Sequence, residues 1–163
     1  MKRNLAITIA ALLAIGCNSR VQDSAPPSAT IATQPAARVI FPDGFPVRIE
    51  IAADEATREQ GLMYRDRLAD DAGMLFFFTK TDEYSFWMKD TLIPLDIIWI
   101  DEQKKIVHIG AGIPPCRADP CPSYPPNAKA MYVLEVASGV AAKHRLAEGS
   151  VLRFEGTERV VAR

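Results

Sequence analysis

The sequence predicts a mainly β fold: a single-domain sandwich or squat barrel with two short helices. Three observations support this class. Short runs rich in Val, Ile, Phe, Tyr and Trp recur along the chain, each bounded by Gly, Pro or acidic clusters. Only two stretches have a helical pattern, and each spans two to three turns. Beyond the N-terminal leader and linker, roughly 125 residues remain, which suits one ordinary domain with one core.

The N-terminus has the pattern of a bacterial lipoprotein signal. Lys2 and Arg3 precede an apolar run, Leu5–Ile15, which is too short for a permanent membrane span. The sequence Leu13-Ala14-Ile15-Gly16-Cys17 resembles a lipobox, so we expect residues 1–16 to be removed and Cys17 to be lipidated. The alternative is an ordinary secretory signal that leaves Cys17 as a spare thiol.

Residues 17–37 are predicted to be the lipidated Cys and a flexible linker. The stretch "NSRVQDSAPPSATIATQPAA" is rich in Ser, Ala, Pro and Thr and has few large apolar residues. We therefore expect the folded domain at 38–163, held at a membrane by Cys17. Asn18 after the lipidated Cys resembles the signal for the outer membrane, so the expected location is the cell envelope, facing the periplasm.

Strand patterns account for most of the domain. "VRIEIA" alternates and predicts a half-exposed strand, whereas "MLFFF" and "LDIIWI" predict strands covered on both faces. The predicted strands are Arg38–Phe41, Pro46–Ala52, Gly73–Phe78, Tyr84–Lys89, Leu95–Asp101, Lys105–Ile109, Ala130–Val136, Val151–Glu155 and Glu158–Ala162.

The two helical patterns lie at residues 53–65 and 138–149. Asp54 is the expected N-cap of the first helix, and acidic residues follow in its first turn. Ser138 is the expected cap of the second, and Gly149 lies beyond its end. In a sandwich or barrel, such short helices would plug the ends.

Charge and motifs exclude several functions. Without residues 1–16 the chain has a net charge of about −3, so no nucleic-acid partner is expected. The only histidines, His108 and His144, lie near no nucleophile motif. No glycine-rich phosphate or dinucleotide loop is present, and no cofactor is expected.

Cys116 and Cys121 lie in the proline-rich segment "PPCRADPCPSYPP". Outside the cytoplasm a cysteine pair usually oxidises, and the spacing suits a small disulfide-closed loop. A metal site with the distant histidines, or a redox-active pair, are the alternatives. Redox pairs are usually Cys-x-x-Cys at a helix start, and the prolines argue against a helix, so we predict a structural disulfide and no metal.

Three ordered motifs resemble a known family. "GLMYR" at Gly61–Arg65, "GMLF" at Gly73–Phe76 and "SFWMKDTLIPLD" at Ser85–Asp96 are similar to motifs of the domain of unknown function 192 family. The resemblance extends over residues 46–155. It implies a mainly β, jelly-roll-like fold. It points to no particular biochemical activity, because the family has none assigned. One departure is Asp90, where many members have Asn.

The densest candidate site is "YSFWMKDTLIPLDIIWID" at residues 84–101. On a strand, Ser85, Trp87 and Lys89 share one face, which combines a flat aromatic ring, a hydroxyl and a cation, as ligand sites do. After a turn at 90–94, the next strand is expected to return antiparallel and bring Asp96 near Lys89. The alternative is an internal Lys89–Asp96 salt bridge that fixes the strand register.

Arg65 is a second candidate cation, although it would also suit the end of the first helix. We therefore expect a lipid-anchored envelope domain that binds a small molecule, a glycan or an envelope protein through these residues. One rival is an envelope hydrolase or lyase in which Asp96 or Glu135 is the general base. The other is a structural envelope-assembly factor.

Overall fold

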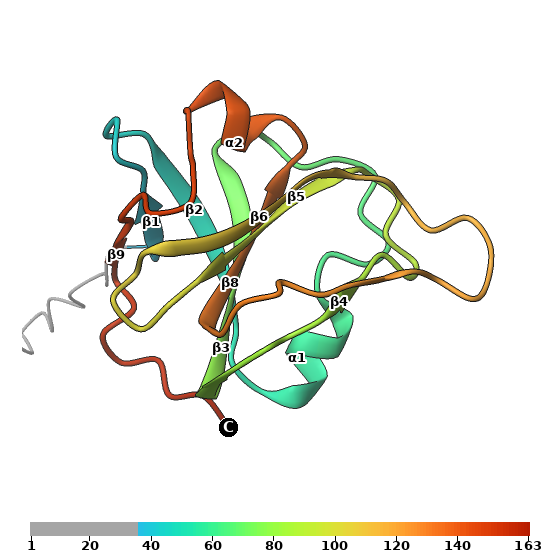
Figure 1. Cartoon of the computed structure of the whole chain (residues 1–163), viewed down its shortest axis with the longest axis horizontal. Helices are drawn as coiled ribbons and strands as arrows, with labels where there is room; N and C mark the ends of the chain where they lie inside the picture. The colour runs from blue at the N-terminus through green and yellow to red at the C-terminus, as the bar shows by residue number, and fades with distance from the viewer. Residues whose placement is uncertain (1–35) are drawn as a thin grey trace, which may run out of the picture. The chain divides into compact units, whose positions relative to one another are not determined.

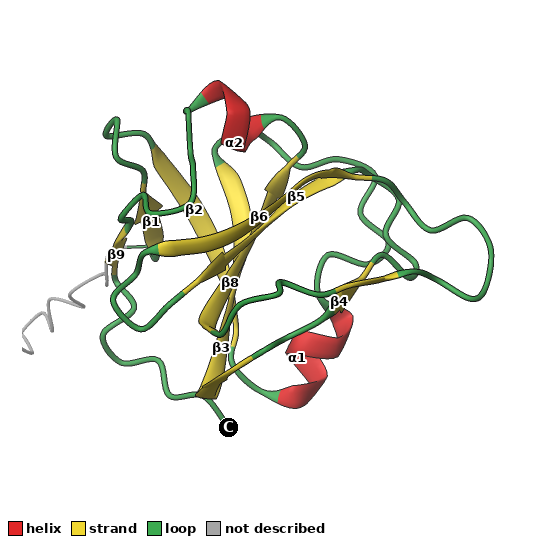
Figure 2. Ribbon diagram, viewed as in Figure 1, coloured by secondary structure: helices red, strands yellow, loops and turns green. Residues whose placement is uncertain are grey.

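The computed structural model describes residues 36–163, which belong to one compact unit, Thr33–Arg163. The expected signal peptide, Cys17 and most of the linker lie outside the described residues. The predicted mainly β fold with two short helices is confirmed (Figures 1 and 2). Within residues 36–163, no helix has both the length and the apolar character to cross a membrane.

Seven strands form one curled sheet, shaped like a half-barrel. Their order is β6-β5-β8-β3-β2-β1-β9, and all neighbours are antiparallel except β2 and β3. The bounds are β1 Arg38–Ile40, β2 Pro46–Ala52, β3 Ala72–Asp82, β5 Leu95–Ile100, β6 Ile106–Ile113, β8 Ala130–Ala137 and β9 Arg153–Glu155. A bridge between Lys105 and Val151 links the two edges of the sheet.

A second sheet has two short strands, β4 Phe86–Trp87 and β7 Ser123–Tyr124. Two short helices, α1 Glu55–Gln60 and α2 Val140–Lys143, lie on opposite sides of the folded unit in Figure 1. Helix α2 packs against the sheet with buried Val140 and Ala141. Helix α1 buries none of its residues.

The sheet has an apolar cluster on each face. One cluster contains Val39, Leu75, Ile98 and Leu134 and includes the buried residues of α2. The other contains Phe76, Ile97, Trp99 and Val133 and includes Leu62 and Met88, from the segments beside α1 and β4. Alternate residues of β5 therefore belong to different clusters, and all six are buried. This is why "LDIIWI" shows no alternation in the sequence.

Several strand boundaries differ from the expected ones. The run Tyr84–Lys89 contributes only the two residues of β4, and 158–162 forms a turn and coil instead of a strand. Strand β4 pairs with β7, which the sequence did not predict, and not with Leu95–Ile100. Strand β5 instead pairs with β6 and β8, so the expected antiparallel return from β4 is wrong.

Both helices are shorter than the patterns at 53–65 and 138–149. The predicted N-cap of α1 is confirmed, since Asp54 accepts a hydrogen bond from the Thr57 amide at 2.9 Å. The expected cap of α2 is wrong: Gly139 is the N-cap, and no side chain caps that end. Gly139 has φ +92°, a conformation that glycine adopts without strain.

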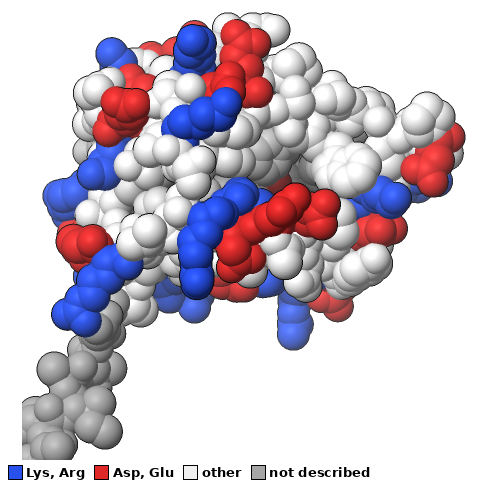
Figure 3. Space-filling model, turned by 90° about the horizontal axis from the view of Figure 1, so that it is seen from below, with Lys and Arg blue, Asp and Glu red and all other residues white. Residues whose placement is uncertain are grey.

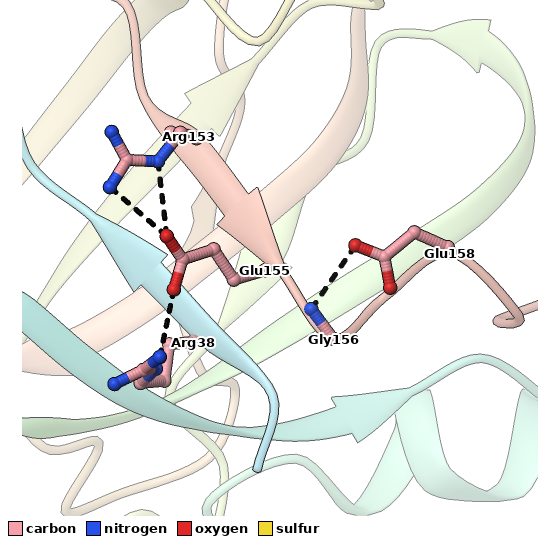
Figure 4. Close-up of polar contacts among 5 residues, drawn as sticks. All are labelled: Arg38, Arg153, Glu155, Gly156 and Glu158. Carbon is pink, nitrogen blue, oxygen red and sulfur yellow. Dashed lines mark hydrogen bonds and ion pairs between the residues drawn. The ribbon is translucent and has the colours of Figure 1, made fainter. Parts of the chain in front are cut away.

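An ion pair links β1 to the edge strand β9, and a second lies within β9. Glu155 accepts hydrogen bonds from Arg38 at 2.9 Å and from Arg153 at 3.1 Å (Figure 4). Gly156 then donates its amide to Glu158, where the chain leaves β9. These contacts are part-exposed and lie away from the candidate site described below.

Candidate functional site

A cleft lies between α1, the loop after it and β4, on the face of the sheet that carries the Phe76–Trp99 cluster. Two grooves of about 260 and 410 Å³ share Glu59 and Trp87 in their linings. A third, smaller cavity of about 30 Å³ is lined by the same two residues and by Gly61 and Glu135. We call these three connected linings the α1–β4 cleft.

Glu135 is the buried acid of this cleft. It lies on the central strand β8, between Met74 of β3 and Ile97 of β5, and is 5% exposed. Among the described residues, none donates a hydrogen bond to its carboxyl group. Burial raises the pKa of Glu135 from 4.5 to about 8, partly offset by the positive charge of Arg65. A carboxyl group of this kind is largely neutral at pH 7 and can donate a hydrogen bond.

The cavity beside Glu135 is small but real. Gly61 lines it, and a Cβ placed there would make ordinary van der Waals contacts, at 3.8 Å from a Glu135 oxygen and 3.5 Å from Phe76. Gly61 has φ +47°, so a larger residue would be strained in its backbone. A volume of about 30 Å³ has room for roughly one or two water-sized groups, such as a ligand hydroxyl.

Arg65 lies next to this carboxyl but is held by another one. Its guanidinium donates two hydrogen bonds to Glu50, at 2.5 and 2.7 Å. This pairing lowers the pKa of Glu50, chiefly through the hydrogen bonds from Arg65. Arg65 is therefore an electrostatic neighbour of Glu135, and the structure gives it an ion-pair partner instead of a helix-capping contact.

Ser85, Trp87 and Lys89 share a side of their segment, as the sequence predicts. Trp87 is 50% exposed, whereas Met88 is buried in the apolar cluster. The Lys89 amino group lies 5.4 Å from the centre of the Trp87 ring. Ser85 lines the 260 Å³ groove, and Lys89 lines the other groove and the small cavity. These three predicted residues therefore do meet in the cleft.

Asp96 does not belong to the cleft. It is 1% exposed, lies on the α2 side of the sheet and accepts backbone hydrogen bonds from Gly112 at 2.8 Å, Gly139 at 3.0 Å and Ala141 at 2.9 Å. The expected approach of Asp96 to Lys89 is therefore wrong. The reason is the alternation along β5, which turns Asp96 away from the face that carries Ile97 and Trp99.

The edge of the cleft includes two residues with left-handed backbone. Tyr64 has φ +63° and Asp90 has φ +52°. The Tyr64 amide donates to the Asp90 carbonyl at 2.8 Å, and its hydroxyl donates to the Asp90 carboxylate at 3.1 Å. Such strain often gathers at functional sites. An αL position favours Asn or Asp, so Asp90 suits its backbone conformation.

The cysteines and histidines lie outside this cleft. The predicted Cys116–Cys121 disulfide is confirmed and closes the long loop between β6 and β8. His108 lies 3.4 Å from Glu148, and His144 lies 2.7 Å from Asp43. Within residues 36–163, no group of three or more His, Cys, Asp or Glu side chains could hold a metal ion.

Sequence reasoning missed Glu59 and Gly61 as cleft residues. Glu59 is an exposed acid on a short helix, and nothing in its spacing marks it. Gly61 begins the "GLMYR" motif, and an unexplained glycine at a helix end was the available signal. Glu135 was named only as a possible base, because a lone acid in the apolar run "YVLEVA" does not show which face it occupies.

The comparisons with known proteins agree with the motifs. A chain of Sinorhizobium meliloti 1021, described as a putative transcription regulator, is 34% identical with a TM-score of 0.66, covering 74% of this chain and 92% of that one. A protein of unknown function from Novosphingobium aromaticivorans DSM 12444 is 31% identical with a TM-score of 0.64, covering 72% and 82%. No curated protein matches significantly.

The family comparison covers most of the chain. The family described as DUF192, Uncharacterized ACR, matches residues 38–154, which include every residue of the α1–β4 cleft. This range agrees with the described fold from β1 to β9. The chain belongs to the domain of unknown function 192 family.

Proposed function

We propose that this protein is a lipid-anchored cell-envelope domain that binds a small polar ligand in the α1–β4 cleft. The observation that carries the proposal is Glu135, a buried carboxyl group that borders a small cavity and receives no hydrogen bond from the described residues. Since no described residue donates to it and it borders the cavity, the Glu135 carboxyl group is free to hydrogen-bond to a ligand group placed there.

The composition of the cleft supports binding. Ligand sites combine apolar walls with a few converging polar groups. Here Phe76 and Phe86 provide the wall, and Thr91 and Lys89 join Glu135 in the smallest cavity. The two rings pack on each other, since Phe86 lies edge-on against buried Phe76 at 5.0 Å between ring centres. The aromatic wall of the site is therefore part of the packed cluster on this face of the sheet.

The envelope location is part of the same proposal and comes from the sequence around Cys17. The disulfide in the β6–β8 loop supports it, because such bonds persist mainly in oxidising compartments. In this setting the ligand would be a molecule of the periplasm or of the envelope itself.

A thermal-shift screen of residues 33–163 with polar metabolites and glycan fragments tests the proposal. This unit contains both apolar clusters and needs no other part of the chain for its core. A ligand that raises the melting temperature of the wild type should lose that effect with Glu135→Gln. The matched control is Glu148→Gln, because Glu148 is an exposed acid outside the cleft. Equal shifts in all three proteins would contradict the proposal.

A second candidate is hydrolysis or elimination with Glu135 as general acid or base. The observation that favours it is the raised pKa of Glu135, about 8, which suits proton transfer near neutral pH. Asp96 is not a candidate, because three backbone amides occupy its carboxylate. A ligand found in the screen should then be consumed by the wild type and not by Glu135→Gln.

A further inference from the structure

The shape of the α1–β4 cleft restricts the kind of ligand. The two larger grooves are open to solvent along their length, and they meet at Glu59 and Trp87. The cavity beside Glu135 is lined by the same two residues, so it lies at the junction. An extended molecule could occupy both grooves and place one group beside Glu135, whereas a compact metabolite would use only one of them.

The aromatic lining restricts the chemistry. Trp87 offers a flat, half-exposed ring at the junction, and the 260 Å³ groove continues along Phe78 and Tyr84, which stack with 3.5 Å between ring centres. Flat rings beside polar groups suit ligands with alternating apolar and hydroxyl-bearing faces. The C–H face of a pyranose ring is such a surface.

The charges argue against a strongly ionic ligand. The 260 Å³ groove is lined by Glu55 and Glu59 as well as Arg58, and the other groove by Glu59 and Asp90 as well as Lys89. Viewed from the α1 side, basic and acidic side chains are intermixed on the surface (Figure 3). The protein's own cations already lie over two rings, Lys89 over Trp87 and Arg58 over Phe78. A ligand amine would have to compete with them.

From this geometry we infer that the ligand is a saccharide chain of at least two or three rings, which lies across Trp87 with a hydroxyl or acetamide group beside Glu135. Neutral groups that both donate and accept hydrogen bonds match the mixed lining of acids, bases, Ser85 and Gln60. This inference rests on the proposed function and narrows it from a small polar ligand to one class.

The test measures binding of N-acetylglucosamine and its β-1,4-linked dimer and tetramer to residues 33–163. Isothermal titration calorimetry gives the affinities of the wild type and of every variant, and in the wild type a ligand-induced change in fluorescence reports mainly on Trp87, because the other tryptophan, Trp99, is fully buried. The tetramer should bind at least about tenfold more tightly than the monomer, because linked rings engage both grooves. Trp87→Ala should weaken tetramer binding about tenfold, and Trp87→Phe should keep most of it.

Val151→Ala is the matched control, because Val151 is an exposed apolar residue outside the cleft. Equal affinity for monomer and tetramer, or an unchanged affinity in Trp87→Ala, would overturn the inference. If the saccharides fail and another ligand depends on Glu135 in the screen, the saccharide inference falls and the proposed function stands. If no ligand depends on Glu135, both fall.

Discussion

Two buried acids on adjacent strands of this sheet have opposite surroundings. Asp96 on β5 faces the α2 side and receives three backbone hydrogen bonds. Glu135 on β8 faces the α1 side and receives none from the described residues. A carboxylate that accepts several amide hydrogen bonds stabilises a fold, while one left beside a cavity is available to a ligand. The first is therefore a structural group and the second a candidate functional one.

Asp96→Asn should destabilise the domain by about 2–3 kcal/mol, because the replacement amide nitrogen would face backbone donors. Lys89→Met should cost under about 1 kcal/mol, since Lys89 makes no ion pair among the described residues and contacts the exposed Trp87. Urea unfolding of the two single variants and the double variant measures both. Additive effects are expected, because the side chains lie on different faces. A strong coupling energy between the two substitutions would instead indicate that Lys89 and Asp96 interact directly.

Glu135 should make the domain less stable as the pH rises. Its folded-state pKa of about 8 lies above the ordinary 4.5, so between these values the folded state holds a proton that the unfolded chain has lost. The free energy of unfolding should then fall by roughly 1 kcal/mol per pH unit from about pH 5 to pH 8. Glu135→Gln should remove this slope, and Glu148→Gln should keep it. Urea unfolding at pH 5, 6.5 and 8 measures how the free energy of unfolding changes with pH in each protein. The same pH dependence in the wild type and in Glu135→Gln would show that Glu135 ionises normally.

The sequence predicted one part of the site well. Ser85, Trp87 and Lys89 share a side because residues two apart in an extended segment point the same way, and that relation is local. The position of Glu135, across the cleft, was not predictable in this way. "PLDII" and "VLEVA" each carry one acid in an apolar run, and which face each acid occupies depends on long-range strand pairing.

At the scale of elements, α1 is the least anchored part of the cleft. It buries no residue, so it is held by its cap, by Arg58, which donates to the carbonyls of Phe77 and Arg163, and by the segments beside it. Most of the stability of a short helix normally comes from packing of an apolar face. Helix α1 is therefore expected to open more easily than the strands, and its opening would change the shape of both grooves.

Asp54→Ala tests this expectation. The loss of the cap should cost about 1 kcal/mol, because the Thr57 amide loses its acceptor. Amide hydrogen exchange should speed up across Glu55–Gln60, with little change in β5 and β8. Asp70→Ala is a suitable control, because Asp70 is an exposed acid whose contact is a surface pair with Lys143. Faster exchange throughout the sheet would show that the cap supports the whole fold.

The sequence located the core strands to within a residue or two at their starts, although β3 and β6 each end four residues beyond the predicted end. The bounds of β2 match the sequence pattern, and β5 and β8 each differ by one residue at one end, because burial imposes a strong pattern there. The run at 158–162, "ERVVA", has two charged residues followed by three apolar ones and forms no strand. Strand β7 consists of two residues in a proline-rich loop, and it forms only because Phe86 and Trp87 lie opposite.

At the scale of the whole molecule, the two faces of the curled sheet differ, because only one of them borders the candidate site. Its α2 side contains one apolar cluster, closed by hydrogen bonds between the segments before β6 and β9. Its α1 side contains the second cluster and, at its margin, the α1–β4 cleft. Substitutions in the cleft should therefore cost less stability than substitutions around Asp96. The Asp96 carboxylate accepts hydrogen bonds that hold α2 to the sheet, and the cleft residues make no such contact with α2.

The proposed envelope location gives the last prediction. If Cys17 carries the lipid, Cys17→Ser should release the protein from the membrane fraction into the soluble periplasm. The physical reason is that the acyl chains bind the bilayer by about 0.8 kcal/mol per buried methylene, and no helix within residues 36–163 could replace them. Cell fractionation and immunoblotting measure the distribution. The control is Cys116→Ser with Cys121→Ser, which removes the disulfide but keeps Cys17. That variant should stay with the membrane, and a Cys17→Ser protein that stays there too would refute the lipid anchor.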